Sequence, residues 1–412
     1  MLLSYKVKNF RSFAEEAEFD LLAPGNKVKK RFPDNYVATE QGLDILKTAV
    51  IIGENAGGKT NFIDSLWFLK KLFEDNRSKY AYKGWVNINK APSPGQDPRE
   101  GDTNQSFDLC VLSDSGIVYH YFLEIDAFSI VREKLSYQKA KSDIEKLVLD
   151  IKRKKLEGDV EKGPLKVSVE VDMPNSKAKD FFSDIFSSKD EIGLFVTKLA
   201  ILGDEHALEF VDWLNNKLSV ESQPINYDVY KSIQKEEEDL KILRDARFLD
   251  ILKMVDYSID RIEVDEEKPF SESKIIRKMK NGKDFSEELK RDSAGVREFF
   301  AWAVQLFKVV YEDKIVIADE MDRVINPILA ERMVAFINGK KHRGQFVFST
   351  HNALHLDLKN YMKEQIYFVT KTREDLNSEL YSLADFPDVR YETTKIYEFY
   401  MKGILGGTAN FP

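Results

Sequence analysis

Residues 49–60 of the chain are Ala-Val-Ile-Ile-Gly-Glu-Asn-Ala-Gly-Gly-Lys-Thr. The four apolar residues predict a buried strand, and beyond it apolar residues recur at helical spacing, namely Phe62, Ile63, Leu66, Trp67 and Leu69. A strand that enters a helix through Gly53–Thr60 fits the phosphate-loop pattern, in which glycines let backbone N–H groups wrap phosphates. In this pattern Lys59 contacts the β- and γ-phosphates of ATP, and Thr60 binds Mg²⁺.

A second apolar strand ends in two acidic residues. Ile315–Ala318 is followed directly by Asp319 and Glu320. A carboxylate at a strand end beside a phosphate loop can hold Mg²⁺, and an adjacent Glu can orient or deprotonate the attacking water. In a chain without a phosphate loop, a solvated strand end would be the simpler interpretation. Here we predict a metal ligand at Asp319 and a catalytic base at Glu320.

A third predicted strand, Gln345–Phe348, ends at Ser349-Thr350-His351. An imidazole at this position can donate a hydrogen bond to a γ-phosphate and so report its loss. His355 follows four residues after His351, but no Glu lies between or near them in the arrangement of zinc proteases, so we do not expect a zinc site. We predict a catalytic role for His351.

The helix predicted over Val296–Val310 is preceded by Ser293-Ala294-Gly295. A hydroxyl and a glycine at a helix N-terminus can bind an anion, although Ser is also simply a good N-cap. The order along the chain adds weight to the first interpretation. It runs from the phosphate loop through the Ser-x-Gly helix and the Asp-Glu strand to the His strand, and this order distinguishes an ABC-type head from kinases and small GTPases.

Composition narrows the class of protein. With 412 residues the chain is longer than a single core usually grows, so two or three structural units are expected. It has 43% hydrophobic residues and a net charge of −8, which excludes a disordered chain and a uniformly cationic surface for nucleic acid. One cysteine, Cys110, permits neither an internal disulfide nor a thiolate zinc site. The sequence shows no membrane span and no signal peptide, so a cytoplasmic protein without membrane contact is expected.

Three regions are predicted within an α/β fold. Residues 1–137 form an N-terminal ATPase lobe that carries the phosphate loop and an antiparallel β lobe. Residues 138–258, where Lys and Glu dominate, are expected to form a mostly helical insertion. Residues 259–412 form a C-terminal ATPase lobe, which begins with a hairpin closed by Asn281-Gly282.

On these motifs the chain resembles the RecF/SMC-like branch of ABC ATPases. More narrowly, it resembles the compact heads of OLD-type and RloA/AbiL-type ATPases from abortive-infection and restriction-associated operons. The resemblance covers most of the chain, and its motifs are Asn9–Phe13, Gly53–Thr60, Asp292–Gly295, Ala318–Asp322, Ser349–Asn352 and Leu380–Phe386. Two departures stand out, since Gly57 replaces a frequent Ser and Ile325-Asn326-Pro327 replaces a frequent Leu-His-Pro.

The resemblance implies a role for each matching residue. Lys59 and Thr60 bind triphosphate and Mg²⁺, Asp319 supports the Mg²⁺, Glu320 activates water and His351 senses the γ-phosphate. Ser293 and Gly295 act across a dimer on the partner's nucleotide, with Asp322 in the dimer-contact turn. Arg11 approaches the nucleotide or forms an ion pair within the chain. The implied nucleotide-binding set is therefore Arg11, Gly53, Glu54, Asn55, Ala56, Gly57, Gly58, Lys59, Thr60, Asn61, Ser293 and Gly295.

Two hypotheses of function follow from the resemblance. In the first, the chain is an anti-phage defence ATPase that forms a homodimer or higher oligomer on ATP and controls a separate effector, a nuclease. In the second, it is a RecF-like DNA-binding ATPase of repair or replication, with phosphate contacts from basic clusters at residues 27–31, 152–155 and 274–280. Those clusters are also consistent with solvated charged faces. A stand-alone nuclease is not expected, because no Asp-x-Asp motif follows His351.

The segment 138–258 has two interpretations. A head needs only its two lobes to use ATP, so an insertion of this size is predicted to be a docking surface for a partner or a second copy of the chain. Alternatively it is a packed extension of the helical lobe. Its aromatic residues would form a small core, and any left exposed would form an interaction patch, the residues being Phe181, Phe182, Phe186, Phe195, Phe210 and Trp213.

Overall fold

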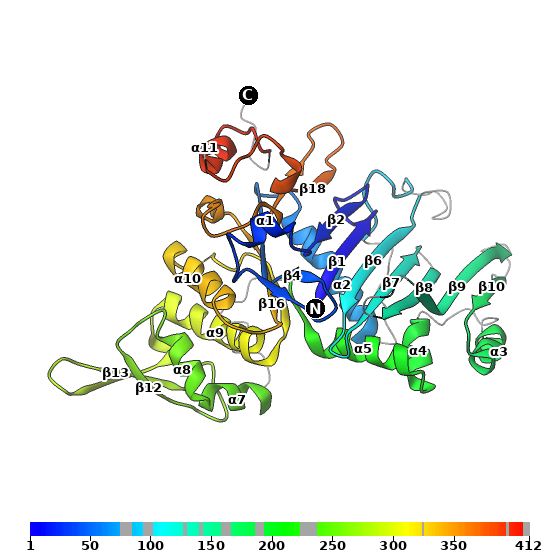
Figure 1. Cartoon of the computed structure of the whole chain (residues 1–412). Helices are drawn as coiled ribbons and strands as arrows, with labels where there is room; N and C mark the ends of the chain where they lie inside the picture. Colours follow the sequence, from blue (N-terminus) through cyan, green and yellow to red (C-terminus); the bar gives the residue numbers. More distant parts are fainter. Residues whose placement is uncertain are drawn as a thin grey trace.

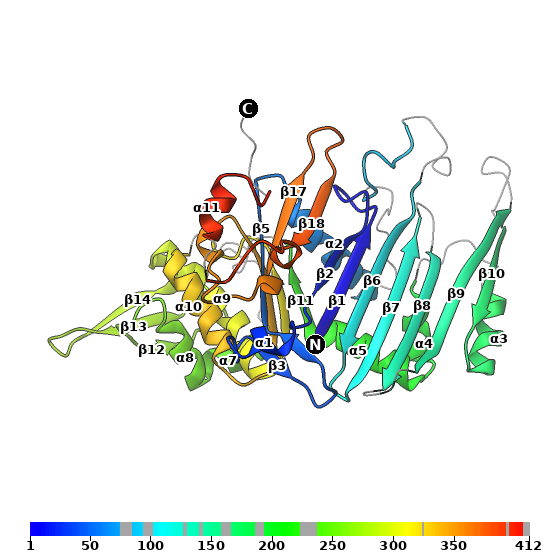
Figure 2. The same cartoon turned by 45° about the horizontal axis from the view of Figure 1, so that its top comes forward.

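A computed structural model gives the fold of the chain. It describes residues 1–74, 85–93, 102–126, 130–139, 142, 144–157, 166–185, 193–222, 237–323, 325–392 and 395–406. Two sheets dominate these residues, one mostly parallel and one antiparallel (Figures 1 and 2). Within the described residues, no helix combines the length and the apolar character that crossing a membrane requires.

The parallel sheet lies between two hydrophobic cores of the molecule. Its strand order is β11-β15-β16-β5-β17-β18, and only β18 runs antiparallel to its neighbour. Because neighbouring strands are parallel, their carboxyl ends meet at one edge, where ligands of such sheets usually bind. The strands are β5 (Thr48–Gly53), β11 (Leu218–Glu221), β15 (Ile315–Ala318), β16 (Gln345–Thr350), β17 (Ile366–Lys371) and β18 (Ser378–Ser382).

Strand β5 is buried along its whole length because both faces of the core sheet are covered. Ala49 and Ile51 face a hydrophobic core shared with α2 and the antiparallel sheet. Val50 and Ile52 face a second core shared with α9 and α10. Because successive side chains of a strand point to opposite faces, β5 contributes to two separate hydrophobic cores. These helices are α2 (Lys59–Glu74), α9 (Ala294–Glu312) and α10 (Pro327–Asn338).

The antiparallel sheet forms the lobe, in the order β10-β9-β8-β7-β6-β1-β2 (Figure 2). It packs on α2, where the ring centroids of Tyr5 and Phe62 lie 5.8 Å apart and the Tyr5 hydroxyl donates to Ser65 Oγ at 2.9 Å. The strands are β1 (Leu2–Lys8), β2 (Ala17–Asp20), β6 (Gln105–Leu112), β7 (Ile117–Ile125), β8 (Ile130–Lys139), β9 (Glu145–Glu157) and β10 (Lys166–Asp172). The predicted antiparallel lobe is therefore confirmed.

The segment 138–258 differs from the mostly helical insertion that we expected. Strands β9 and β10 extend the lobe sheet, and β11 is the edge strand of the core sheet, paired with β15. The prediction was wrong because charged residues on the solvent face of the lobe sheet pair across strands. Arg132 of β8, for example, pairs with Asp150 of β9 at 2.6 Å. Such Lys- and Glu-rich alternation is close in composition to an exposed helix.

Five helices of this segment lie among the described residues, and they divide between the two parts of the molecule. The helices α4 and α5 contact the lobe and α2, whereas α7 and α8 contact α9. Buried Glu133 of β8 ties α4 to the lobe, since its carboxylate accepts from the backbone N–H groups of Phe195 at 2.6 Å and Val196 at 3.2 Å. The helices are α3 (Ser176–Ile185), α4 (Phe195–Ile201), α5 (Glu205–Lys217), α7 (Glu237–Arg244) and α8 (Ala246–Leu252).

The aromatic residues of this segment mostly serve the core of the whole molecule. Four are buried, namely Phe182, Phe195, Phe210 and Trp213. Phe181 is 44% exposed, and Phe186 lies outside the described residues. The predicted small separate core is therefore wrong for those four, which join the large core on α2 and the lobe sheet.

The remaining elements are small. The predicted Asn-Gly hairpin is confirmed, and with β12 it forms a three-stranded sheet that projects at the left of Figure 1. These strands are β12 (Ile259–Glu263), β13 (Lys274–Lys278) and β14 (Asp284–Glu288). The described residues also contain a two-stranded sheet and two short α-helices, namely β3 (Tyr36–Ala38), β4 (Asp44–Leu46), α1 (Asn26–Lys29) and α11 (Ile396–Met401).

Candidate nucleotide site

A cavity of about 310 Å³ lies at the carboxyl edge of the core sheet. It is lined by residues 55–61, Glu320, His351 and Lys371. The loop 53–58 follows β5, and α2 begins at Lys59, so the strand, loop and helix predicted from the sequence are confirmed. The N-terminus of α2 presents unpaired backbone N–H groups beside this cavity, which favours an anion there.

Lys59 lies at the bottom of the cavity and is 5% exposed. Its Nζ donates to the carbonyl oxygens of Gly53 at 2.9 Å and Glu54 at 3.0 Å. Burial lowers the pKa of this amine to about 8, although the nearby carboxylates of Asp319 and Glu320 oppose the shift. The lysine is therefore held in place and lacks full compensation for its charge, which an anionic ligand would supply.

Thr60, which lines the cavity, contacts Asp319, the residue that follows β15. The Thr60 hydroxyl donates to Asp319 Oδ2 at 2.7 Å, and the Ser349 hydroxyl donates to Oδ1 at 2.6 Å. Burial raises the pKa of the Asp319 carboxyl, which the two hydroxyl donors only partly offset. A hydroxyl and a carboxylate side by side are the hard oxygen ligands that Mg²⁺ takes in combination with substrate phosphates. The residues present therefore fit the ion.

The described residues offer no larger metal-binding cluster, since no group of three or more His, Cys, Asp or Glu side chains comes together among them. His351 and His355 in particular do not converge, because fully buried His355 makes its own contacts elsewhere.

Glu320 and His351 are adjacent at the cavity wall. His351 Nδ1 accepts from Lys59 Nζ at 3.2 Å, so the proton of a neutral imidazole lies on Nε2, which donates to Glu320 Oε1 at 3.2 Å. Glu320 has a left-handed backbone with φ of 47°, and its N–H donates to Ser349 Oγ at 2.8 Å. A non-glycine residue in this conformation carries strain that the surrounding contacts must hold. The turn after β15 thus positions the predicted base.

Two side-chain contacts brace the phosphate loop and the start of α2, and one of them comes from Ser378, which no sequence motif indicated. Ser378, at the start of β18, donates through its hydroxyl to the Gly57 carbonyl at 2.6 Å. Asn61 Nδ2 donates to Ser12 Oγ at 2.7 Å. Gly58 has φ of +121°, and a Cβ there would lie 2.3 Å from Ser378 Oγ, so the position requires glycine. A serine is too common for the sequence alone to reveal this role.

Arg11 does not line the cavity. It pairs with Asp64 of α2, and its Nη1 also donates to Asn61 Oδ1 at 3.3 Å. Its guanidinium lies 4.1 Å from the centroid of the Trp85 ring. Of the two roles left open by the sequence, the structure shows the ion pair, one turn of helix beyond the phosphate loop.

Ser293 and Gly295 also lie away from the cavity. Ser293 caps α9, and its side-chain oxygen accepts from the Val296 N–H at 3.3 Å. It is exposed, and a Cβ built on Gly295 would meet no atom within 4 Å. The preceding Asp292 is held by Arg277 of β13 at 2.6 Å. Among the described residues of a single chain, Ser293 and Gly295 do not belong to the lining of the phosphate-loop cavity.

The turn after Glu320 is fixed by a buried network. Asp322 accepts two contacts from the Thr350 hydroxyl at 2.8 and 2.7 Å, and His355 Nε2 lies 3.6 Å from Asp322 Oδ2. Burial would raise the pKa of Asp322, but its contacts with His355 and Thr350 hold that pKa below the usual value. The segment Ile325-Asn326-Pro327, which departs from the family pattern, begins helix α10. The Asn326 side chain caps the helix, and Pro327 occupies the first helical position.

The glutamine that links nucleotide to lobe in similar heads had no clear position in the sequence. Gln138 lies in β8 of the lobe, paired in register with Val118 and Glu145, and it does not line the cavity. Strand β11 runs beside the Asp-Glu strand and ends at Glu221, whose carbonyl accepts from the Asp319 N–H at 2.9 Å. The sequence continues to Gln223, outside the described residues. With four residues, β11 is too short for the sequence to show that a core strand lies beside the Asp-Glu strand.

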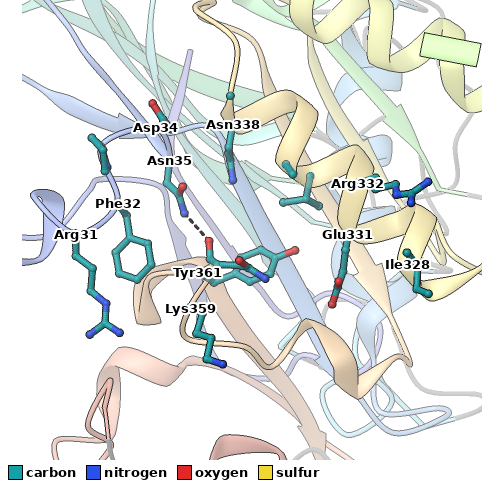
Figure 3. Close-up of a pocket in the computed structure, with 15 residues that line it drawn as sticks. Arg31, Phe32, Asp34, Asn35, Ile328, Glu331, Arg332, Asn338, Lys359 and Tyr361 are labelled. Atoms are coloured by element: carbon teal, nitrogen blue, oxygen red, sulfur yellow. Dashed lines mark hydrogen bonds between the residues drawn. The ribbon is translucent and has the colours of Figure 1, made fainter. Parts of the chain in front are cut away.

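A larger cavity of about 450 Å³ lies at the opposite edge of the core sheet (Figure 3). Its lining includes Asn35, bonded to Gln365 just before β17, and Asn338, bonded to Thr48 at the start of β5. Both contacts lie at the amino ends of parallel strands. This cavity is therefore separate from the phosphate-loop cavity.

The basic clusters named from the sequence are partly neutralised. Lys29 pairs with Asp44, Arg153 pairs with Asp126, and Arg277 pairs with Asp256 at 2.7 Å as well as with Asp292. Each cluster therefore has at least one cation committed to an ion pair within the chain.

Fold and site together define an ABC-type P-loop domain: a mixed α/β core with an antiparallel lobe and a phosphate loop beside an Asp-Glu strand. A family model described as "AAA domain, putative AbiEii toxin, Type IV TA system" matches residues 49–357. The chain belongs to this family. No curated protein matches the sequence.

Solved structures similar to the chain include SMC heads. An SMC head domain from Thermotoga maritima has a TM-score of 0.43 and 14% identity, covering 92% of this chain and 98% of that one. An Smc head with an extended coiled coil, bound to the C-terminal domain of ScpA from Pyrococcus furiosus, has a TM-score of 0.45 and 13% identity, covering 98% of both chains.

Proposed function

We propose that the chain binds MgATP in the phosphate-loop cavity and hydrolyses it to ADP and phosphate. One observation carries the proposal: together with Ser349, five residues from three separate stretches of sequence form one connected set of contacts of 3.2 Å or less at this cavity, namely Lys59, Thr60, Asp319, Glu320 and His351. Mg²⁺ held at Thr60 and Asp319 would neutralise charge on the phosphates during the reaction.

In the proposed reaction, Glu320 accepts a proton from water as that water attacks the γ-phosphorus. The bond to the β,γ-bridging oxygen breaks, and ADP leaves. The Lys59 ammonium and the N–H groups of the loop stabilise the charge that moves onto the bridging oxygen. His351, whose Nε2–H is aimed at Glu320, orients this base and is free to donate to the γ-phosphate instead.

We further propose that two chains close on two ATP molecules, so that the Ser293-Gly295 turn of each acts on the nucleotide of the other. The exposure of this turn and the open space at Gly295 support the proposal. The assembly would be a homodimer or a higher oligomer of such dimers.

The biological role that we propose is anti-phage defence, in which ATP-driven closing controls a separate effector, a nuclease. The membership in a family described by a type IV toxin–antitoxin system supports a role of this kind, and so does the narrower resemblance to OLD-type and RloA/AbiL-type heads. The alternative of a DNA-repair ATPase has weaker support, because the basic clusters are partly ion-paired.

The test begins with purified full-length chain and Mg²⁺-dependent phosphate release from ATP. Turnover that needs Mg²⁺ supports the catalytic proposal, and absence of both ATP binding and turnover overturns it. The role is tested by phage plating on cells that carry the chain with its neighbouring genes. Protection that is lost without a neighbouring nuclease gene supports defence, whereas ATP-dependent, salt-sensitive duplex binding without protection supports the repair alternative.

A further inference from the structure

Lys371 is a cavity residue to which no sequence motif pointed. It is the last residue of β17 and lines the same cavity as the phosphate loop, Glu320 and His351. Lys59 and Lys371 are the two lysines in that lining. Because Lys371 comes from a strand on the other side of β5 from the catalytic residues, it requires a separate explanation.

The backbone of Lys371 is placed firmly against the loop. Val369 pairs in register with Gly53, and packing there is so close that a Cβ on Gly53 would lie 2.3 Å from the Val369 carbonyl oxygen. Across β18, Lys371 pairs in register with Ser378, whose hydroxyl donates to Gly57. The start of the side chain is therefore fixed relative to both ends of the loop.

The charge of Lys371 is available to a ligand. Among the described residues, no hydrogen bond and no carboxylate within 4.0 Å involves its Nζ, and the residue is partly exposed. Lys59 differs, since its Nζ already donates to two carbonyls and to His351. A partly exposed cation without a partner at the rim of an anion-binding loop gains a charge-assisted contact when a phosphate arrives.

We propose that Lys371 binds the phosphates of the nucleotide from the side of the loop opposite Glu320 and His351, and that it contacts the phosphates that ATP and ADP share. The strand order supports this division, since β15 and β16 carry the γ-phosphate machinery on one side of β5 and β17 lies on the other. Lys371 is then a binding residue for both nucleotides, and His351 a residue for ATP alone. The inference rests on the proposed function of the cavity.

The experiment compares calorimetric affinities of full-length variants for MgADP and for a non-hydrolysable Mg-bound ATP analogue. Lys371→Met is expected to weaken both by the same factor, about tenfold, through loss of one charge-assisted contact. His351→Ala is expected to weaken only the ATP analogue. Lys371→Arg keeps the charge and is expected to stay within about threefold of wild type, which shows that the Met variant has not simply lost the fold.

Arg373→Met is the matched control, because Arg373 is an exposed cation two residues further on that does not line the cavity. It should leave both affinities unchanged, and a loss equal to that of Lys371→Met would overturn the inference. Wild-type affinities in Lys371→Met, or weakening of the ATP analogue alone, would also overturn it while leaving the proposed function intact. A wild-type chain that binds neither nucleotide would instead overturn the proposed function itself.

Discussion

The phosphate-loop cavity and the Ser293–Gly295 turn were both named from sequence motifs, yet their surroundings in the structure differ. In the cavity, each catalytic side chain contacts a residue from another part of the same chain, as Thr60 contacts Asp319 and His351 contacts Glu320. The turn is exposed, and among the described residues Ser293 bonds to its own helix and to Asp292. The cavity brings its motif residues together within one chain, whereas Ser293 and Gly295 do not line that cavity. The predictions below test this contrast.

The largest effect is expected from Lys59→Ala, which should abolish detectable ATP binding and therefore all turnover. Removal of the ammonium deletes charge-assisted contacts to the phosphates, equivalent to a loss of affinity of at least about a hundredfold. Isothermal titration calorimetry checks this. Lys71→Ala is the control, because Lys71 lies on the same helix but pairs with Glu74 at the surface. Unchanged ATP affinity in Lys59→Ala would mean that the cavity is not the nucleotide site.

Glu320→Gln should slow turnover by about a hundredfold to ten-thousandfold and leave ATP affinity near that of wild type. The amide retains the oxygen that accepts from His351, so the geometry is kept and only the base is lost. The variant should therefore accumulate as an ATP-bound dimer, visible by light scattering after size exclusion. Undiminished turnover would show that another group accepts the proton.

A smaller effect, about a tenfold loss of turnover, is expected from Ser293→Gly. Glycine is nearly as good an N-cap as serine, so helix α9 should be retained while the hydroxyl is removed. ATP binding by a single chain should not change. Because Ser293→Gly has an intact phosphate loop and Lys59→Ala an intact turn, mixing the two inactive or weak variants should raise turnover above the sum of their separate rates. Additive rates in the mixture would count against action across a dimer.

The residues of the phosphate-loop cavity differ in whether the sequence alone could predict their roles. The motifs around Lys59, Asp319 and His351 sit at ends of short apolar strands, and parallel pairing alone brings such ends to one edge. The fold class followed for the same reason. The bracing residue Ser378 and the cavity residue Lys371 belong to no motif, since their roles arise from the register of β17 and β18 against β5.

The segment 138–258 shows the opposite case. Charged residues on the solvent face of β9 hid its strand period, and the four residues of β11 were too few to identify it as part of the core sheet. Its proposed role in docking a partner stays a prediction. Since β11 pairs with β15, replacing the whole segment would remove a core strand, so a fair test must confine substitutions to the exposed residues, such as Phe181.

The smallest effect is expected from Arg277, which links the projecting hairpin to the Ser293 turn. Its guanidinium donates to Asp256 at 2.7 Å and to Asp292 at 2.6 Å, and Asp292 Oδ1 accepts from the Ser293 N–H at 2.7 Å. Arg277→Gln should leave ATP binding by a single chain unchanged and lower turnover by about threefold to fivefold, because the turn is less well ordered before it meets the second nucleotide.

Arg277→Lys should give an intermediate rate, since an ammonium keeps the charge but cannot span both carboxylates with the fixed fork of a guanidinium. Steady-state turnover as a function of chain concentration separates this role from a general loss of stability. A loosened turn raises the concentration needed for half-maximal turnover, whereas partial unfolding lowers the active fraction at every concentration and weakens ATP binding in proportion. If Arg277→Gln weakens ATP binding as much as it slows turnover, Arg277 stabilises the fold as a whole. It would then have no specific role in ordering the Ser293 turn.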